Sequence, residues 1–180
     1  MLEQRIQQQF FESADLLSQT AEALSKPIAD AAQALLGCIT AGGKLMLCGS
    51  GASVALARHG AALMVGRFER ERPGLAALAV AGESEIRALG APGDVLLAIA
   101  VALPTPALLA AVLAAQAKEM TVVALTGSDA GGLGGCLSET DVHIAVPHER
   151  AARIHEAHTL VLHCLCDAVD LQLLGEQEPT

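Results

Sequence analysis

The fold is decided by the stretch Leu45-Met46-Leu47-Cys48-Gly49-Ser50-Gly51-Ala52-Ser53. Its apolar residues predict a short buried strand, the glycines predict a sharp turn, and the residues that follow, Ala52 to Phe68, have helical periodicity. Gly49 and Gly51 lack a Cβ, so backbone N–H groups can approach a ligand there. Ser53 stands where a helix N-cap belongs. Such a turn is either an anion cradle or a connection that binds nothing.

Strand and helix patterns alternate along the rest of the chain. The expected strands cover 44–48, 75–80, 94–101, 121–125 and 142–146, and the expected helices cover 4–16, 20–41, 53–67, 83–89, 106–118 and 149–174. Apolar strands that alternate with helices are typical of a parallel α/β sheet covered on both faces. We therefore expect one domain over 1–180, with N-terminal helices (1–41), an α/β core (44–146), a C-terminal helix (149–174) and a loose tail (175–180).

The composition excludes several classes of function. Aromatic residues make up 2% of the chain and the net charge is -9, which argues against direct binding of nucleic acid. An acidic surface that binds a basic protein stays open. The five cysteines have no paired spacing, and neither a signal sequence nor a membrane-spanning run is evident. We expect reduced thiols, a cytoplasmic location and no membrane contact.

Several motifs resemble one known family. They are Cys48–Ser53, Arg67–Pro73, Gly93–Ile99, Val123–Asp129 and Ala152–His158. Together they are similar to the sugar isomerase (SIS) domain, in its phosphoheptose isomerase subgroup. Cys164-Leu165-Cys166-Asp167 also fits the branch that holds the DnaA initiator-associating protein.

This resemblance implies a three-layer α/β/α sandwich of the flavodoxin-like kind, with about five parallel strands. It also implies a homotetramer bundled through the N-terminal and C-terminal helices. The ligand would be a phosphosugar, and the residues expected to contact it are Gly49, Ser50, Gly51, Ser53, Thr105, Thr126 and Asp129.

The sequence departs from the family at the second loop. Family members that bind phosphosugars carry Ser-Thr-x-Gly-Asn-Ser there, whereas this chain has Ala100-Val101-Ala102-Leu103-Pro104-Thr105. An anion would lose several charge-assisted hydrogen bonds, each worth ~1.5–3 kcal/mol. That loss corresponds to ~10²-fold or more in affinity. The segment between Val80 and Gly93 is also shorter than in relatives.

The isomerases carry a His-x-x-x-Glu pair on the helix after the first loop. Here His59 keeps the first position and Leu63 occupies the second, and leucine cannot take a proton. His163 matches the family's second catalytic histidine, and His155 replaces a neighbouring glutamine. If the chain is an isomerase, His59 and His163 are the expected catalytic residues.

Histidines also suggest a metal site. His155 and His158 are three residues apart on the expected C-terminal helix, and three imidazoles, from His59, His155 and His163, could hold zinc with one open position. Alternatively, these histidines line an interface between subunits.

Two further motifs have structural interpretations. The alternating arginines and glutamates of 67–72 predict a solvated charged turn rather than an anion patch. Cys48 is expected to be a core thiol, because no base adjoins it in the sequence.

The leading functional hypothesis is a non-catalytic SIS-domain protein that binds and bridges copies of the replication initiator. It follows from motifs that match the family's fold, a second loop that lacks most of the family's phosphate-binding groups, and the missing glutamate. The first alternative is an isomerase of sedoheptulose 7-phosphate or a related sugar phosphate. The second is a weak phosphosugar sensor that binds at Ser53.

Overall fold

The computed structural model describes residues 1–176, in which five parallel strands form one sheet. The strands are β1 (Leu45–Gly49), β2 (Ala77–Ala79), β3 (Val95–Ile99), β4 (Thr121–Thr126) and β5 (Val142–Ala145), in the order β2-β1-β3-β4-β5. The helices are α1 (Leu2–Thr40), α2 (Ser53–Val65), α3 (Glu83–Leu89), α4 (Pro106–Ala117), α5 (Leu133–Cys136) and α6 (Ala151–Leu174). This is the flavodoxin-like strand order.

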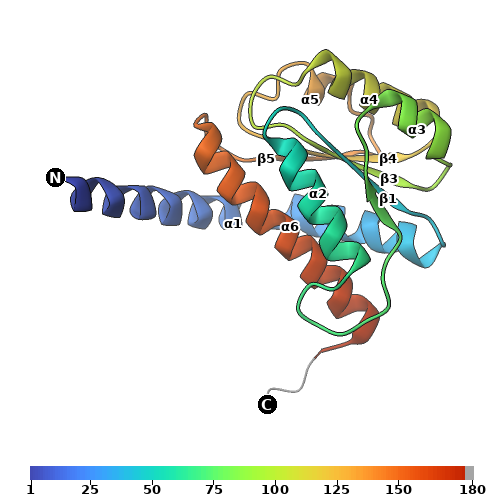
Figure 1. The fold of residues 1–180 in the computed structure, drawn as a ribbon, viewed down its shortest axis with the longest axis horizontal. Coiled ribbons are helices and arrows are strands. Elements are labelled where there is room, and N and C mark those ends of the chain that lie inside the picture. Colours follow the sequence, from blue (N-terminus) through green and yellow to red (C-terminus); the bar gives the residue numbers. More distant parts are fainter. Residues whose placement is uncertain (177–180) are drawn as a thin grey trace.

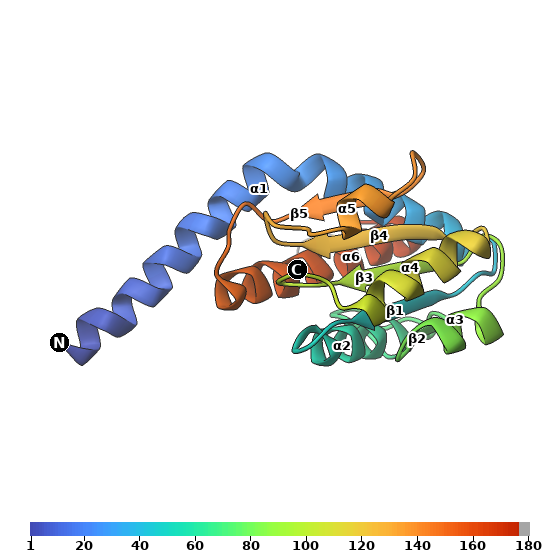
Figure 2. The same cartoon turned by 90° about the horizontal axis from the view of Figure 1, so that it is seen from above.

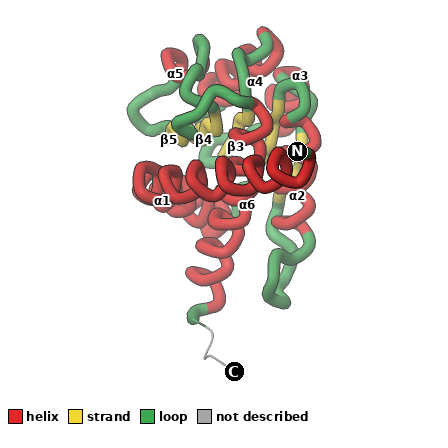
Figure 3. Tube along the Cα trace, turned by 90° about the vertical axis from the view of Figure 1, so that its left-hand side faces the viewer, coloured by secondary structure: helices red, strands yellow, loops and turns green. Residues whose placement is uncertain are grey.

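Helices cover both faces of the sheet, because side chains on a strand point alternately to its two sides (Figures 1 and 3). Leu45, Leu47 and Leu97 pack toward α1, α2 and α6. Met46 and Leu96 pack toward α3 and α4 on the other face. The predicted three-layer α/β/α sandwich with a parallel sheet of five strands is therefore confirmed.

The N-terminal segment is one helix, so the prediction of two helices is wrong. Nothing between residues 16 and 20 breaks the helix, and Pro27 lies inside it, where it removes a single backbone donor. The helix contacts the domain from about Gln9 onward, where Arg153 donates to the carbonyl of Gln9, and Leu16 is already buried. The first turns of the helix project away as an arm (Figure 2). Leu2, Ile6, Phe10 and Phe11 are exposed on this arm.

Most other boundaries lie within a few residues of those predicted. The short helix α5 was not predicted, because Gly131–Gly135 is glycine-rich and resembles a turn. By length and composition α6 could cross a membrane, but it packs against α1 and α2 as part of the fold. The predicted loose tail falls largely on 177–180, outside the described residues.

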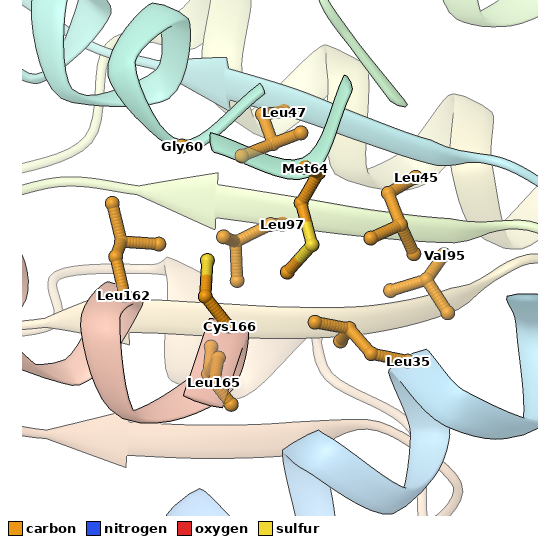
Figure 4. Close-up of a pocket in the computed structure, with 10 residues that line it drawn as sticks. All are labelled: Leu35, Leu45, Leu47, Gly60, Met64, Val95, Leu97, Leu162, Leu165 and Cys166. Atoms are coloured by element: carbon orange, nitrogen blue, oxygen red, sulfur yellow. The ribbon is translucent and has the colours of Figure 1, made fainter. Parts of the chain in front are cut away.

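An apolar void lies between the sheet and the helices α1, α2 and α6 (Figure 4). Its volume is only ≈ 10 Å³, and its lining includes Leu35, Met64, Leu97 and Leu165. A water molecule there would have no polar partner, so the void is a dry packing defect. The functional site must lie elsewhere.

The charged turn is solvated as predicted at Arg67 and Glu71, whose side chains are 59% and 82% exposed, but Arg72 departs from the prediction because it is buried. Its side chain is 1% exposed and pairs with Asp170 of α6, which is 2% exposed. The guanidinium also donates to the carbonyls of Leu63, Met64 and Gly66 at the end of α2. Arg72 therefore joins the end of α2 to α6.

Replacing Arg72 with methionine is expected to lower the free energy of unfolding by about 3–5 kcal/mol, because it leaves a buried carboxylate without its counter-charge. Urea denaturation measures this. Arg70→Met is the matched control, since Arg70 is half-buried and, among the described residues, donates to the carbonyl of Gly175 and to no carboxylate. The double variant Arg72→Met/Asp170→Leu should recover much of the loss. An Arg72→Met protein within 1 kcal/mol of wild type would contradict the role of this ion pair.

Candidate functional site

The glycine turn joins β1 to α2 at the carboxyl edge of the sheet. The N–H of Ser50 donates to the carbonyl of Ile99 at 3.0 Å, which ties the turn to β3. Gly51 has φ +57°, and a Cβ on Gly49 would lie 2.3 Å from the carbonyl oxygen of Ser53. The turn is therefore so tight that a side chain at position 49 does not fit.

Ser53 is not the helix N-cap that the sequence predicts. Ala52 holds the N-cap position, and Ser53 is the first residue of α2, fully buried. Its Oγ lies 3.2 Å from Nε2 of His155 on α6. Among the described residues, no acceptor binds the N–H of Gly51 or Ala52. The donors that this turn can offer an anion are therefore backbone amides rather than the Ser53 hydroxyl.

His59 of α2 faces His163 of α6. Their Nε2 atoms lie 3.5 Å apart, and the rings meet edge to face with centroids 5.8 Å apart. One imidazole must donate and the other accept for this contact to be a hydrogen bond. The pair therefore presents a proton donor and a proton acceptor at one place, and the structure brings together the two catalytic candidates predicted from the sequence.

Three polar contacts follow one another between α2 and α6, and we call them the polar seam. They are Ser53 with His155, His59 with His163, and Arg72 at the end of α2 with Asp170. Along an ideal helix, Ser53 and His59 differ in height by ~9 Å. The seam thus starts at the glycine turn and reaches the histidine pair about two helical turns below it.

The three histidines predicted to share zinc do not meet. His155 lies at the level of Ser53, away from the histidine pair, and His158 points into the core. In the described part of the chain, no group of three or more His, Cys, Asp or Glu side chains could hold a metal ion. Two imidazoles meet instead of three, and zinc binding stays a prediction.

The polar groups predicted on the neighbouring loops are used within the fold. Thr105 is the N-cap of α4, as predicted, and its Oγ1 accepts from the N–H of Leu108. Thr126 is buried, so it does not face a ligand: its hydroxyl contacts Nε2 of His143 at 2.8 Å. Asp129 accepts from the N–H of Gly131.

A cavity of ≈ 400 Å³ lies at the carboxyl ends of β3 and β4. Its lining includes the loop 101–103, Asp129, His148 and Glu149. It is the place in which a ligand could pack against the altered second loop. With carboxylates on one side and apolar residues on the other, it suits sugar hydroxyls and carbon atoms better than a phosphate.

Cys48 lies beneath the glycine turn and is buried. Burial raises the pKa of its thiol to about 11. The group therefore stays protonated near neutral pH, which agrees with a core thiol and not with a nucleophile.

His158 of α6 contacts the carboxyl end of β4 from inside the core. It is fully buried, its Nε2 lies 3.0 Å from the carbonyl oxygen of Thr126, and burial lowers its pKa to about 4. Burial also lowers the pKa of His143, on the other side of Thr126. Both rings are therefore neutral in the folded protein at physiological pH.

The free energy of unfolding should fall as the pH decreases from about 6.5 to about 4. The unfolded chain binds a proton on His158 in this range, whereas the folded protein excludes it until its lower pKa is reached. The pKa difference corresponds to about 3 kcal/mol for His158 alone. Denaturation at several pH values measures the slope.

His158→Gln should flatten this slope, since glutamine keeps a donor and does not titrate. Asp94 and Asp141, whose carboxyl pKa values are held below 3.8 by hydrogen bonds that outweigh burial, lose their contribution only at lower pH. An identical slope in wild type and His158→Gln would contradict the assignment.

Comparisons with known proteins agree on one family. The SIS domain family matches residues 9–127. A phosphoheptose isomerase of Methylibium petroleiphilum is 59% identical, with 100% of this chain and 99% of the relative covered. The corresponding protein of Aromatoleum aromaticum is 44% identical, with 97% of each covered. A solved phosphoheptose isomerase from Neisseria gonorrhoeae is 36% identical, with a TM-score of 0.88, 94% of this chain and 99% of that chain covered.

These names correct the functional prediction. The relatives are isomerases, and therefore enzymes, so the prediction of a non-catalytic protein is wrong. None of these names mentions a replication initiator. The alignment with the Methylibium protein spans 198 positions and this chain has 180 residues, so the relative carries residues that have no counterpart here.

Sequence reasoning missed two parts of the site. The first is Arg72, because alternating charges resemble a solvated turn. The second is Phe68, whose ring lies against His163 with centroids 5.3 Å apart. Its place five residues after Leu63 gave no hint of this contact.

Proposed function

The chain belongs to the SIS domain family, in its phosphoheptose isomerase subgroup, and from this we propose that it interconverts the ketose and aldose forms of a phosphoheptose. The observation that carries the proposal is the contact of His59 with His163, 3.5 Å between Nε2 atoms, at the expected catalytic positions. The predicted substrate is sedoheptulose 7-phosphate.

The reaction moves a proton between two adjacent carbons. A base takes the proton from the carbon next to the carbonyl, and an acid protonates the carbonyl oxygen, which gives an enediol. Return of a proton to the neighbouring carbon, with loss of the other hydroxyl proton, yields the isomer. When the two Nε2 atoms share a hydrogen bond, the ring that donates keeps a free lone pair on Nδ1 and the ring that accepts keeps a free Nδ1–H. One imidazole of the pair can therefore act as the base while the other acts as the acid.

The pair replaces the carboxylate that Leu63 cannot supply. The side chain at position 63 follows His59 by one helical turn and is apolar. Imidazole is a suitable substitute, since its ordinary pKa is close to neutrality and both of its protonation states are accessible there. This supports isomerase chemistry that rests on histidines.

The glycine turn supports the binding of the phosphate. The N–H groups of Gly51 and Ala52 are without acceptors in the described residues, and they stand at the N-terminus of the 13-residue helix α2. His59 lies ~9 Å further along this helix. An extended seven-carbon sugar phosphate has a comparable length, so a phosphate at the turn would bring the opposite end of the sugar to the histidine pair.

The test is turnover of sedoheptulose 7-phosphate by the purified protein, with the aldose product followed by NMR or coupled detection. Conversion is expected, and fructose 6-phosphate should be a poorer substrate because its chain is shorter by one carbon. His59→Gln/His163→Gln is the inactive control. A protein that binds the phosphoheptose but never converts it would overturn the proposal.

We also propose a cytoplasmic homo-oligomer, with four copies as the predicted number. The arm of α1 supports it, since Leu2, Ile6, Phe10 and Phe11 are exposed there and only a partner could cover them.

A further inference from the structure

We propose that Phe68 is a positioning residue, which holds the imidazole of His163 against His59; this inference rests on the proposed function. The ring of Phe68 lies 5.3 Å from that of His163, centroid to centroid, with an angle of 38° between their planes. Phe68 is half-buried and packs against the core under α2 and α6. Its ring therefore has a fixed support behind it.

Within residues 1–176, no carboxylate or carbonyl fixes the orientation of His163 in the usual way. A catalytic histidine is commonly held by a carboxylate or a backbone carbonyl that accepts from its second nitrogen. Among the described residues, the only hydrogen-bonding contact of His163 is with His59. The rotation of the imidazole about its side-chain bonds is then limited by packing, and Phe68 is the apolar ring that lies against it.

The loop that carries Phe68 is itself held in place. Arg72 joins it to the end of α2 and to Asp170, and Arg70 donates to the carbonyl of Gly175 at 2.7 Å. The N–H of Leu75 donates to the carbonyl of Met64 at 3.0 Å, which closes the loop. These bonds anchor Phe68 to α2 and to the end of α6, the two helices that carry the histidine pair. A displacement of either helix would therefore move the ring and the pair together.

The position of the ring also explains why a phenylalanine is needed. A flat ring tilted by 38° against a second ring restricts the rotation of that ring, whereas a leucine of similar hydrophobicity leaves space beside it. Misplacement of a catalytic group by about 1 Å can lower a rate by up to about 10²-fold. The structure thus assigns to Phe68 an effect on the rate that requires no contact with the substrate.

Phe68→Leu tests this, with Phe68→Tyr as the conservative variant and Leu113→Ala, on the exposed side of α4, as the loss of a surface apolar side chain. In Phe68→Leu we expect kcat to fall by about 10-fold with KM within about 2-fold. Tyrosine should restore kcat, and Leu113→Ala should leave it unchanged. An unchanged kcat in a folded Phe68→Leu protein would overturn the proposal.

A second measurement does not depend on turnover. In wild type, the ring protons of His59 and His163 should show a nuclear Overhauser effect to one another, and this signal should weaken in Phe68→Leu but not in Phe68→Tyr. Persistence of the full signal in Phe68→Leu would overturn the positioning role even if the protein proved inactive toward phosphoheptoses. Conversely, loss of the signal in a protein without turnover would support the role of Phe68 and refute only the proposed reaction.

Discussion

Replacing His163 with glutamine is expected to lower kcat for the phosphoheptose by roughly 10²- to 10⁴-fold, the usual contribution of a general acid or base. Glutamine keeps much of the shape of histidine and can hydrogen-bond, but it cannot exchange a proton. His163 reaches the site from α6 and meets His59 of α2 at 3.5 Å between Nε2 atoms. Steady-state kinetics measures the effect, and KM should change far less than kcat.

His59→Gln should lower kcat by a similar factor. The kcat of the double variant should be little lower than that of either single variant, since the two imidazoles act as a unit. His143→Gln is a suitable control, because His143 lies on β5, outside both the polar seam and the lining of the cavity. Losses that multiply in the double variant would contradict a pair that works as one acid–base unit.

Replacing Gly49 with alanine is the second change with a large expected effect. The added Cβ would lie 2.3 Å from the carbonyl oxygen of Ser53 and 2.6 Å from the backbone nitrogen of Val54. These are backbone atoms, so the turn or the start of α2 must move. We expect a loss of about 3 kcal/mol in the free energy of unfolding, at the upper end of overpacking effects. Urea denaturation measures it.

The same substitution should raise KM, because the movement of the turn would displace the backbone amides of Gly51 and Ala52. Gly51→Ala is the comparison: a Cβ there meets no atom within 4 Å, and only the positive φ of +57° opposes it. Its expected loss is about 1–2 kcal/mol. Equal stabilities of the Gly49→Ala and Gly51→Ala proteins would contradict the steric argument.

The fold could be predicted from the sequence because its strands are short apolar runs bounded by turns. Residues 45–48 contain no polar group, and Thr105 with Pro106 marks the start of α4 clearly. The break predicted between residues 16 and 20 was wrong, since nothing there interrupts α1. The prediction of Ser53 as the N-cap was wrong because its hydroxyl is directed to His155, which is distant in sequence, while Ala52 holds the N-cap position.

The candidate site was predicted in part. His59 and His163 were identified by resemblance, but their contact depends on how α2 packs against α6, which periodicity does not give. Arg72 was placed in solvent because charge alternation carries no information on a buried partner nearly 100 residues away. Leucine in place of the family's glutamate at position 63 suggested a non-catalytic protein, and the relatives, which are isomerases, show that this prediction was wrong.

The most direct test of the central claim, proton transfer by the histidine pair, is the entry of solvent deuterium into the sugar. The protein is incubated with sedoheptulose 7-phosphate in deuterium oxide, and the hydrogens on the carbon next to the carbonyl are followed by proton NMR. Because His59 is exposed, a proton that it takes from carbon can exchange with solvent before it returns. We predict deuterium at that carbon with wild-type protein and none with His59→Gln/His163→Gln. Incorporation that is equal in both proteins, or absent from both, would contradict the account.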